Sequence, residues 1–540
     1  MLRLTEIKLA LDHGPAALRA AACQALTISD PVLLDLRIRR RGYDARGGSI
    51  RFVYTLDVML DQEASVLSKQ RGNPHVGRAP DETHQYPVQV AVTPHPRPVV
   101  IGTGPCGLFA ALSLARMGMA PLVLERGQNV RQRAKDVWRF WRQRVLNSAS
   151  NVQFGEGGAG TFSDGKLHSG IKDRGHHIRR ILQDFVDAGA PEEILYISKP
   201  HIGTLRLVKV VEQLRAQIIA AGGEIRFGTQ VTDLVIEAGG VRGVQCAGGE
   251  TLATEQVLLA VGHSARDTFS MLQARGVPMQ AKPFSIGFRI EHPQALIDRA
   301  RLGRHAGHPQ LGAADYKLVH HASNGRVVYS FCMCPGGQVV AASSEPGQVV
   351  TNGMSHYSRN ERNANAGIVV DVTPRDFGQG DPLAGMHWQR ALEARAFALG
   401  GGNYNAPAQR VGDFLAGRAS SVPGEVIPSY TPGVTWTDLS GLLPPEVIAA
   451  IREALPIFAR QVRGFAMDDA VLTAVETRTS SPIRIPREAE TFECPGVRGL
   501  YPAGEGAGYA GGILSAAVDG MKVAEALALH YSKKVTHEPG

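Results

Sequence analysis

The sequence predicts an α/β fold built around a parallel sheet, and three observations support this prediction. A β-branched run at residues 97–101 leads into Gly102, Gly104 and Gly107, and an Ala/Leu-rich helix follows directly. A second glycine-rich turn begins at residue 504, about 400 residues further on, and also leads into a helix of small residues. Between the two turns, helical spacing of apolar residues alternates with short apolar runs that are typical of strands.

The first turn has the pattern of a nucleotide-binding strand–turn–helix unit. Gly102 allows the tight turn after the strand, Gly104 allows a pyrophosphate to approach the backbone, and Gly107 allows close packing of helix and strand. The following helix N-terminus offers free N–H groups and a partial positive charge to phosphates. The next strand, at residues 121–124, ends at Glu125, about 20 residues on, where an acid that binds a ribose is expected.

The bulk composition is that of a globular protein with two or three domains. The chain has 540 residues, of which 44% are hydrophobic and 20% charged, and its formal charge of +8 is mild for this length. Its six scattered cysteines favour a reducing cytoplasm over a disulfide scaffold. No run of eighteen apolar residues and no signal peptide is visible, so we expect a cytoplasmic protein without a membrane helix.

Residues 1–90 are expected to form a small N-terminal α+β domain with its linker, the linker proper being the proline-rich stretch at 69–97. Arginines between residues 37 and 51 raise the hypothesis of RNA binding, but a solvated or docked strand face is favoured because interleaved aromatic residues are missing. The predicted elements are a helix at 16–22, a strand at 32–41, a turn at Gly47–Gly48 and a strand at 49–58.

Residues 97–274 are expected to form the first part of the nucleotide-binding domain. A loop at residues 151–167 carries many glycines beside polar side chains, which suits a backbone that must approach a flat ligand. The other predicted elements are helices at 131–144 and 204–219 and strands at 224–227, 231–236, 241–245 and 256–263.

Residues 275–490 are expected to form an inserted domain of mixed β-strands and helices that binds the substrate. Its predicted elements are strands at 284–290, 327–331 and 339–342 and helices at 383–399 and 445–465.

Residues 491–533 close the fold, and their glycine-rich turn identifies the expected nucleotide as FAD. NAD enzymes do not need a second turn of this kind, whereas FAD places its ADP half at the first turn and its flavin across the last. Glu505 can hydrogen-bond ribityl hydroxyls, and the helix N-terminus at Gly512 and Ile513 can direct amides at the N1–C2=O edge of the flavin.

Five segments then point to a family. Residues 151–167, 262–267, 284–293, 331–337 and 351–355 closely resemble bacterial FAD-dependent dehydrogenases of unassigned substrate that carry an FAD-dependent C-terminal domain. The resemblance runs over essentially the whole chain and implies a Rossmann-like FAD-binding domain of glutathione-reductase type, assembled from two separated segments. It also implies a cytoplasmic flavoprotein. The closing turn has Gly504-Glu505 where Gly-Asp is usual.

These patterns supply the candidate cofactor-binding residues. Lys166 and His263 are the catalytic candidates, and His168 could also face the flavin. No second Gly-x-Gly-x-x-Gly unit is present, so NAD(P)H is expected at most as an electron donor without its own domain. The cofactor-binding candidates are Gly102, Gly104, Pro105, Cys106, Gly107, Glu125, Arg126, Arg133, Gly157, Gly158, Thr161, Ser163, Asp164, Gly165, Lys166, Val231, Gly262, Gly504, Glu505, Gly512 and Ile513.

The inserted domain contributes a second group of candidates. Cys332 and Cys334 are two residues apart, so on a strand they would share one face, as a dithiol facing the flavin or as two small buried side chains. No second cysteine pair or histidine cluster completes a metal site beside them, and no metal is expected. Arg289 and Asn352 are further candidates for contact with the substrate.

The sequence therefore predicts an FAD-dependent oxidoreductase that transfers a hydride between flavin N5 and a small organic substrate. Two alternatives stay open. One is a flavoprotein that acts in RNA modification, although nucleic acid is the less favoured partner. The other is a non-enzymatic redox sensor that uses flavin and the two cysteines.

Overall fold

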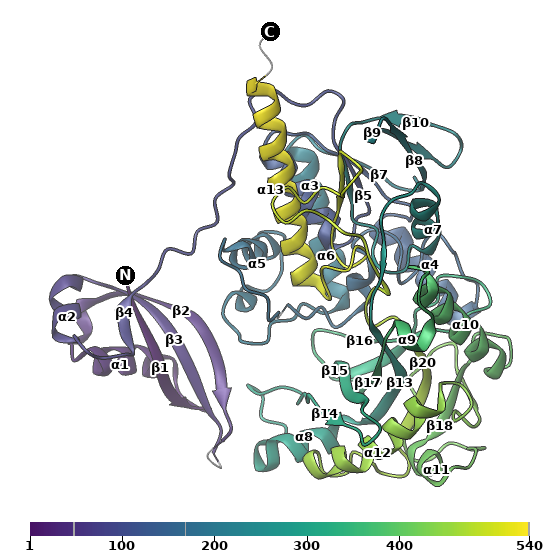
Figure 1. Ribbon diagram of the computed structural model, residues 1–540. Coiled ribbons are helices and arrows are strands. Elements are labelled where there is room, and N and C mark those ends of the chain that lie inside the picture. The colour runs from purple at the N-terminus through teal and green to yellow at the C-terminus, as the bar shows by residue number, and fades with distance from the viewer. Residues whose placement is uncertain (47–48, 168, 538–540) are drawn as a thin grey trace.

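The computed structural model describes residues 1–46, 49–167 and 169–537, so the turn predicted at Gly47–Gly48 and the candidate His168 lie outside the described residues. Figure 1 shows three parts: a small N-terminal sheet, a parallel sheet with helices around it, and a large, mostly antiparallel sheet below.

The N-terminal part is a four-stranded antiparallel sheet with strand order β2-β3-β1-β4. Strand β3 alternates buried and less buried residues, so Phe52, Leu56 and Val58 face the core and anchor the sheet on two helices. Strand β4 lies within the stretch that is predicted to be linker. Because the residues of β4 pair with β1, the linker begins after β4 and not at residue 69. The elements are β1 Leu2–Ala10, α1 Pro15–Leu26, β2 Leu33–Asp44, β3 Arg51–Leu60, α2 Glu63–Lys69 and β4 Val76–Arg78.

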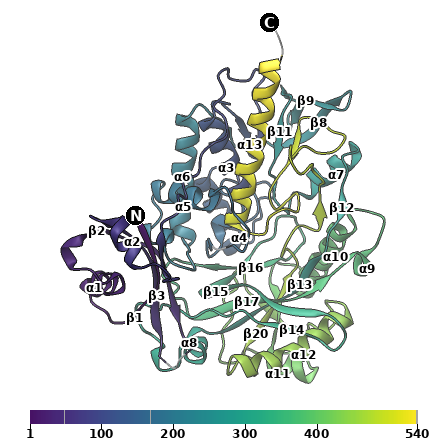
Figure 2. The ribbon, with the colours of Figure 1, turned by 60° about the vertical axis from the view of Figure 1, so that its left-hand side comes forward.

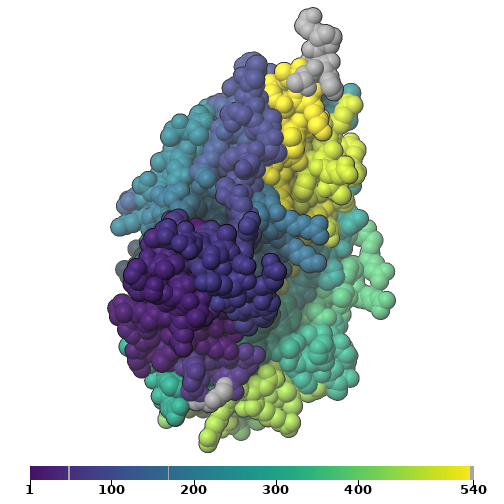
Figure 3. All heavy atoms as spheres, turned by 90° about the vertical axis from the view of Figure 1, so that its left-hand side faces the viewer, coloured from purple at the N-terminus to yellow at the C-terminus, as the bar shows by residue number. Residues whose placement is uncertain are grey.

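Several arginines of this sheet form ion pairs, and the backbone of another one, Arg41, contacts the rest of the chain. Arg3 binds Asp57 and Glu82, and Arg39 also binds Glu82, which lies in the linker. The backbone N–H of Arg41 donates to the carbonyl of Tyr196 at 2.6 Å. Figure 3 shows the N-terminal sheet against one side of the molecule, with the linker running upward beside α13.

The parallel sheet joins residues from both ends of the remaining chain. Its strand order is β22-β11-β5-β6-β7 and every neighbouring pair is parallel. Helices α3 and α13 pack against each other beside it (Figures 1 and 2). The strands are β5 Val99–Ile101, β6 Leu122–Leu124, β7 Glu224–Arg226, β11 Val257–Leu259 and β22 Leu500–Pro502; the helices are α3 Pro105–Arg116, α4 Val130–Gln143, α5 His177–Asp187, α6 Thr204–Ala220, α7 Arg266–Ala274 and α13 Ile513–His537.

Two small sheets accompany the parallel one. Strands β8 Val231–Glu237, β9 Gly240–Cys246 and β10 Thr251–Ala253 form an antiparallel meander. Strands β12 Gln280–Ala281 and β21 Ile483–Arg484 pair where the chain leaves the parallel sheet and where it returns.

The large sheet has eight strands, and α12 packs against its strands β14, β15 and β17. Its middle strands, β13 and β17, are almost entirely buried, which explains their apolar sequence. The elements are β13 Phe284–Pro293, α8 Gln294–Leu302, β14 Val319–His321, β15 Val327–Ala341, β16 Thr351–Ser355, β17 Asn363–Val372, α9 Pro374–Phe377, α10 Ala384–Leu399, β18 Ala406–Arg410, α11 Val411–Ala416, β19 Val434–Trp436, α12 Pro445–Gln461 and β20 Val471–Glu476.

Strand β15 corrects the prediction of two separate strands in this region. It runs unbroken from Val327 to Ala341, with irregular pairing to β17 on both sides of Cys334. The irregularity breaks the alternation of side chains, because an extra residue in one strand shifts the faces of those that follow.

Candidate functional site

A cavity of about 540 Å³ opens at the carboxyl ends of β5, β6 and β11 and extends to β15 and β16 of the large sheet. In open parallel sheets this edge is where ligands bind. The N-terminal ends of α3 and α13 both reach it, through Pro105 and Ile513.

The glycines of the first turn and of the 151–167 loop bring two backbones together at the cavity wall. Gly158 has a φ of +60°, and a Cβ there would lie 2.7 Å from the Cα of Gly104. Gly102 has a φ of +103°, and a Cβ there would lie 2.5 Å from the carbonyl oxygen of Ala260. A Cβ at Gly107 would lie 1.9 Å from the carbonyl oxygen of Gly102, so this glycine lets α3 pack on β5.

Glu125 reaches the cavity at the end of β6, where the sequence places it. Its carboxylate also organises the surrounding turns. Oε2 accepts hydrogen bonds from the N–H and hydroxyl of Thr103, at 2.9 and 2.6 Å. Oε1 accepts from the N–H groups of Gly127 and Gly155, at 2.8 and 3.1 Å.

Arg133 does not line the cavity, which corrects its prediction as a cofactor contact. Its side chain is fully buried and donates to the carbonyl oxygens of Asn151, Val152, Gly155 and Glu156. An arginine has five donors and needs such acceptors when buried, so it holds the glycine loop in shape. The loop residues Gly157 and Thr161 likewise contact each other rather than the cavity, as a Cβ at Gly157 would lie 2.1 Å from Thr161 Oγ1.

The closing turn brings Glu505 to the cavity. Burial raises the pKa of its carboxyl to about 7, although the positive charge of Lys282 acts in the opposite direction. Gly504, predicted as a cofactor contact, instead packs the turn on α3, since a Cβ there would lie 2.8 Å from the Cβ of Cys106. Gly512 and Ile513, which are predicted to face the flavin, line the cavity.

His263 lies opposite Glu505, with 4.0 Å between His263 Nε2 and Glu505 Oε1. Burial and the positive charges of Arg478 and Arg266 lower the pKa of His263 to about 3, so its ring is neutral. Its Nδ1 is 2.9 Å from the hydroxyl of Ser264. This hydroxyl donates to Gln153 Oε1 and accepts from Arg478, so Nδ1 carries the ring proton and Nε2 is an acceptor.

A buried ionic cluster lies behind His263, and the sequence does not predict it. The carboxylate of Glu393 accepts from both Arg266 and Arg478 at 2.8 to 3.0 Å, and the two guanidinium groups hold its pKa at about 2 against the effect of burial. Arg478 and Thr479 line the cavity directly after the buried strand β20. Polar residues at the end of an apolar run were the signal that could have found them.

Lys166 reaches the cavity beside Asp164 and the large sheet. Its Nζ lies 3.2 Å from Asp164 Oδ2 and donates to the carbonyl oxygen of Met333. Burial lowers the pKa of Lys166, but Cys334 and Asp164 outweigh burial and the pKa is raised. The side chain is therefore a fixed positive charge.

Cys332 and Cys334 are brought to the same place, but only Cys332 lines the cavity. Cys332 has a φ of +43° and lines the cavity, whereas Cys334 is fully buried and its thiol lies 3.3 Å from the carbonyl oxygen of Cys332. The interaction with Cys334 lowers the pKa of the Cys332 thiol, and Lys166 and Arg289 lower it further. The pKa of Cys334 is raised.

Arg289 lies behind the cavity wall rather than in it. Its guanidinium binds Glu476 at 2.9 and 3.0 Å and also donates to the carbonyl oxygen of Cys332 and to the side chain of Asn352. It thus positions Cys332 and Asn352, both of which line the cavity. The remaining predicted residues that line it are Pro105, Cys106, Arg126, Ser163, Asp164, Gly165, Val231 and Gly262.

Comparison with known proteins identifies the family. Residues 171–329 match the family model described as FAD dependent oxidoreductase, and residues 283–479 match that of the FAD-dependent protein, C-terminal domain-like. Residues 1–59 match a domain of unknown function. An "uncharacterized protein" of Clostridium beijerinckii is 46% identical over 528 residues, which covers 97% of this chain and 98% of that one.

The chain belongs to the FAD-dependent oxidoreductases. Solved structures with some similarity to this oxidoreductase include glycine oxidase from Geobacillus kaustophilus, at 12% identity, covering 84% of this chain and 95% of that one with a TM-score of 0.34. CtdE in complex with FAD matches at 13% identity, 82% and 86% coverage and a TM-score of 0.31.

FAD is the cofactor of this oxidoreductase, and the residues of the cavity fit it. Two glycine turns expose backbone beside two helix N-termini, which suits a pyrophosphate. The groove then continues past Glu505 to polar and charged groups of the large sheet. None of the helices in the described part of the chain is long and apolar enough to cross a membrane.

Proposed function

We propose that this oxidoreductase moves a hydride between flavin N5 of FAD and a small organic substrate that carries an anionic group. The observation that supports this proposal is that one cavity connects the glycine turns to Lys166, Cys332 and Asn352. Bound FAD supplies the two-electron chemistry, and the chain supplies binding, orientation and proton transfer.

The two ends of the cavity have different tasks in this proposal. Residues 102–106 and Gly158 hold the pyrophosphate, and Glu505 with Gly512 and Ile513 holds the ribityl chain and flavin, in a domain of glutathione-reductase type. This domain is assembled from residues 97–274 and 491–533, and residues 275–490 complete the substrate side.

Three side chains differ in the chemistry that they can perform. Lys166 keeps its charge and so binds an anionic group of the substrate rather than taking up a proton. Glu505, with a pKa of about 7, is suited to transfer a proton near neutral pH, whereas neutral His263 accepts a hydrogen bond from the substrate or from Glu505.

An anaerobic titration tests the proposal. Purified FAD-loaded protein is mixed with NADH, NADPH or a panel of amino and hydroxy acids while the flavin absorbance is followed. We expect at least one anionic donor to bleach the flavin, and Lys166→Met to raise the KM for that donor about tenfold or more with unchanged FAD content. Lys209→Met, at an exposed position of α6, is the matched control. If no donor of either class reduces the flavin, hydride transfer to a small substrate is refuted.

A second candidate function is dithiol redox exchange, favoured by the cavity position of Cys332 and its contact with Cys334. Oxidation of this pair forms one S–S bond, breaks two S–H bonds and releases two protons and two electrons, the number that FAD accepts. Thiol counting after anaerobic incubation with oxidised FAD should show two thiols fewer in the wild type. Cys332→Ser should lose none, and Cys494→Ser, whose thiol is buried elsewhere, should behave like the wild type.

A further inference from the structure

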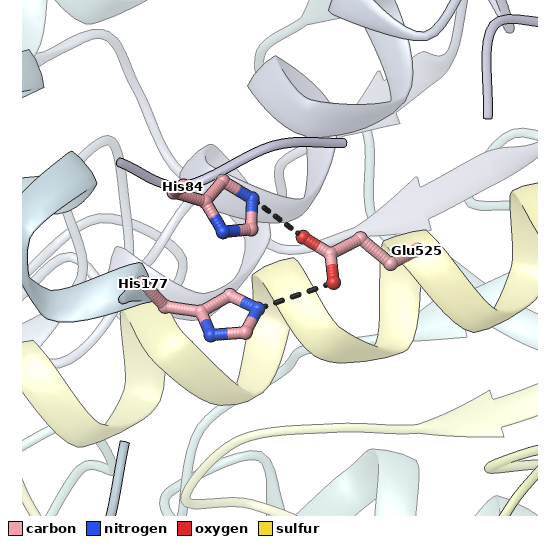
Figure 4. Close-up of side chains that lie close together, drawn as sticks. All are labelled: His84, His177 and Glu525. Atoms are coloured by element: carbon pink, nitrogen blue, oxygen red, sulfur yellow. Dashed lines mark hydrogen bonds and ion pairs between the residues drawn. The ribbon is translucent and has the colours of Figure 1, made fainter. Parts of the chain in front are cut away.

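Three side chains from distant segments meet outside the cavity. His84 comes from the linker, His177 from the start of α5 and Glu525 from α13 (Figure 4). His84 Nε2 lies 2.9 Å from Glu525 Oε1, and His177 Nε2 lies 3.1 Å from Glu525 Oε2. One nitrogen of each ring and the carboxylate lie within 4.8 Å of one another.

The outward nitrogens of both rings already have acceptors. His84 Nδ1 lies 2.7 Å from the carbonyl oxygen of Gly175, which can only accept, so this nitrogen carries a proton. His177 Nδ1 lies 3.1 Å from the carboxylate of Asp173. Histidines that bind metals usually donate their second ring N–H to a carbonyl or carboxylate in this way.

One inward pair is satisfied, since His177 Nε2 is hydrogen-bonded to Glu525 Oε2 at 3.1 Å, whereas the pair of His84 Nε2 and Glu525 Oε1 is not. With its proton on Nδ1, the ring of His84 presents the lone pair of Nε2 to Glu525 Oε1 at 2.9 Å. The side chain of His84 is only 3% exposed, and neither its Nε2 nor Glu525 Oε1 has a hydrogen-bond partner among the described residues. Buried acceptors that face each other without a donor are unfavourable, and a cation between them removes this cost.

We propose that His84, His177 and Glu525 bind a divalent transition-metal ion, with Zn²⁺ as the best match. Two imidazoles and one carboxylate are a common ligand set for Zn²⁺, and water completes the fourth position. Ligand atoms around tetrahedral Zn²⁺ are about 3.3 Å apart for bonds of about 2.05 Å. The two nitrogen–oxygen contacts of 2.9 and 3.1 Å are close to this spacing, and the whole set, now within 4.8 Å, contracts around the ion.

The bound ion would fasten the linker to the oxidoreductase. His84 lies between the N-terminal sheet and β5, and Glu525 lies about 18 Å along α13 from the helix end that lines the cavity. The site therefore joins the linker to the helix whose N-terminus faces the cofactor.

Metal content measured on the full FAD-loaded chain without an affinity tag tests the site. The protein is treated with a chelator, dialysed, equilibrated with Zn²⁺ and analysed by calorimetry and elemental mass spectrometry. We expect the wild type to bind one more Zn²⁺ per chain than His84→Gln or Glu525→Gln, and to gain thermal stability on Zn²⁺ addition that these variants do not. His387→Ala, at an exposed histidine of α10, should match the wild type.

X-ray absorption at the zinc edge provides a measurement that needs no variant. Scattering from two imidazoles without sulfur supports the site, whereas sulfur ligands would place the ion at cysteine and overturn it. Equal zinc content in the wild type and His84→Gln would overturn it too. So would a wild type that binds no Zn²⁺, which would mean that extra ring protons pair with Glu525 instead.

Discussion

Replacement of Gly158 by alanine tests whether two backbones form the pyrophosphate cradle. The new Cβ would lie 2.7 Å from Gly104 Cα, and an ordinary contact needs about 3.4 Å, so the loop and the turn must move apart by about 0.7 Å. The φ of +60° adds about 1–2 kcal/mol of strain for a residue with a side chain. Separating the turns removes a hydrogen bond from a backbone amide to a phosphate, which is worth about 1.5–3 kcal/mol.

The expected result is a Kd for FAD that rises about 10- to 100-fold. Gly189→Ala is the matched control, because Gly189 has a φ of +94° but no atom within 4 Å of the added Cβ. It should lower stability by about 1 kcal/mol and leave the affinity for FAD unchanged. Fluorescence titration of apoprotein with FAD gives both affinities, and thermal unfolding gives the stabilities. The reasoning is refuted if Gly158→Ala binds FAD as tightly as Gly189→Ala does.

Three further outcomes are expected from the ionisable groups behind and beside the cavity. Glu393→Gln removes the negative charge that compensates two buried guanidinium groups. The free energy of unfolding, measured by denaturant titration, should therefore fall by about 3–5 kcal/mol. A loss below about 1 kcal/mol would contradict the stabilising role of this ionic cluster. The pKa of His263 is about 3 in the folded protein, below its unfolded value. Its contribution to stability is therefore present above about pH 6.5 and is lost as the pH falls towards 3. In His263→Gln the melting temperature should change less with pH between 6.5 and 3 than it does in the wild type. The pKa of Glu505 is raised to about 7 in the folded protein. Its contribution to stability is therefore present below about pH 4.5 and is lost as the pH rises to 7. Glu505→Gln apoprotein should be more stable than wild-type apoprotein at pH 8 but not at pH 4.

Much of the fold follows from local patterns. The spacing of apolar residues places α4, α6 and α10 within a few residues of their observed bounds, because one helical face must be buried. The glycine spacing likewise places the first turn and the closing turn, since those glycines have conformations or contacts that a Cβ would prevent. The prediction of two strands in place of β15 was wrong, because pairing with both β16 and β17 carries that strand across glycines that favour a turn locally.

The site was predicted less completely than the fold. Arg133 was predicted as a cofactor contact, yet its donors bind four backbone carbonyls of a loop about 20 residues away. Glu393 and Arg478 are about 130 and 215 residues from Ser264, and no local pattern joins them. Partners of this kind are found only when the chain has folded.

The sequence by itself determined the two glycine turns, the parallel sheet and FAD as the expected cofactor. It could do so because backbone conformation and hydrophobic periodicity depend on residues that are close together in the sequence. The tertiary structure alone decided which side chains face the cavity. It brought Cys332 to the cavity wall and buried Cys334, although the two residues are only two positions apart. It also brought His84, His177 and Glu525 together over 441 residues, because contacts between distant segments depend on packing that no short stretch encodes.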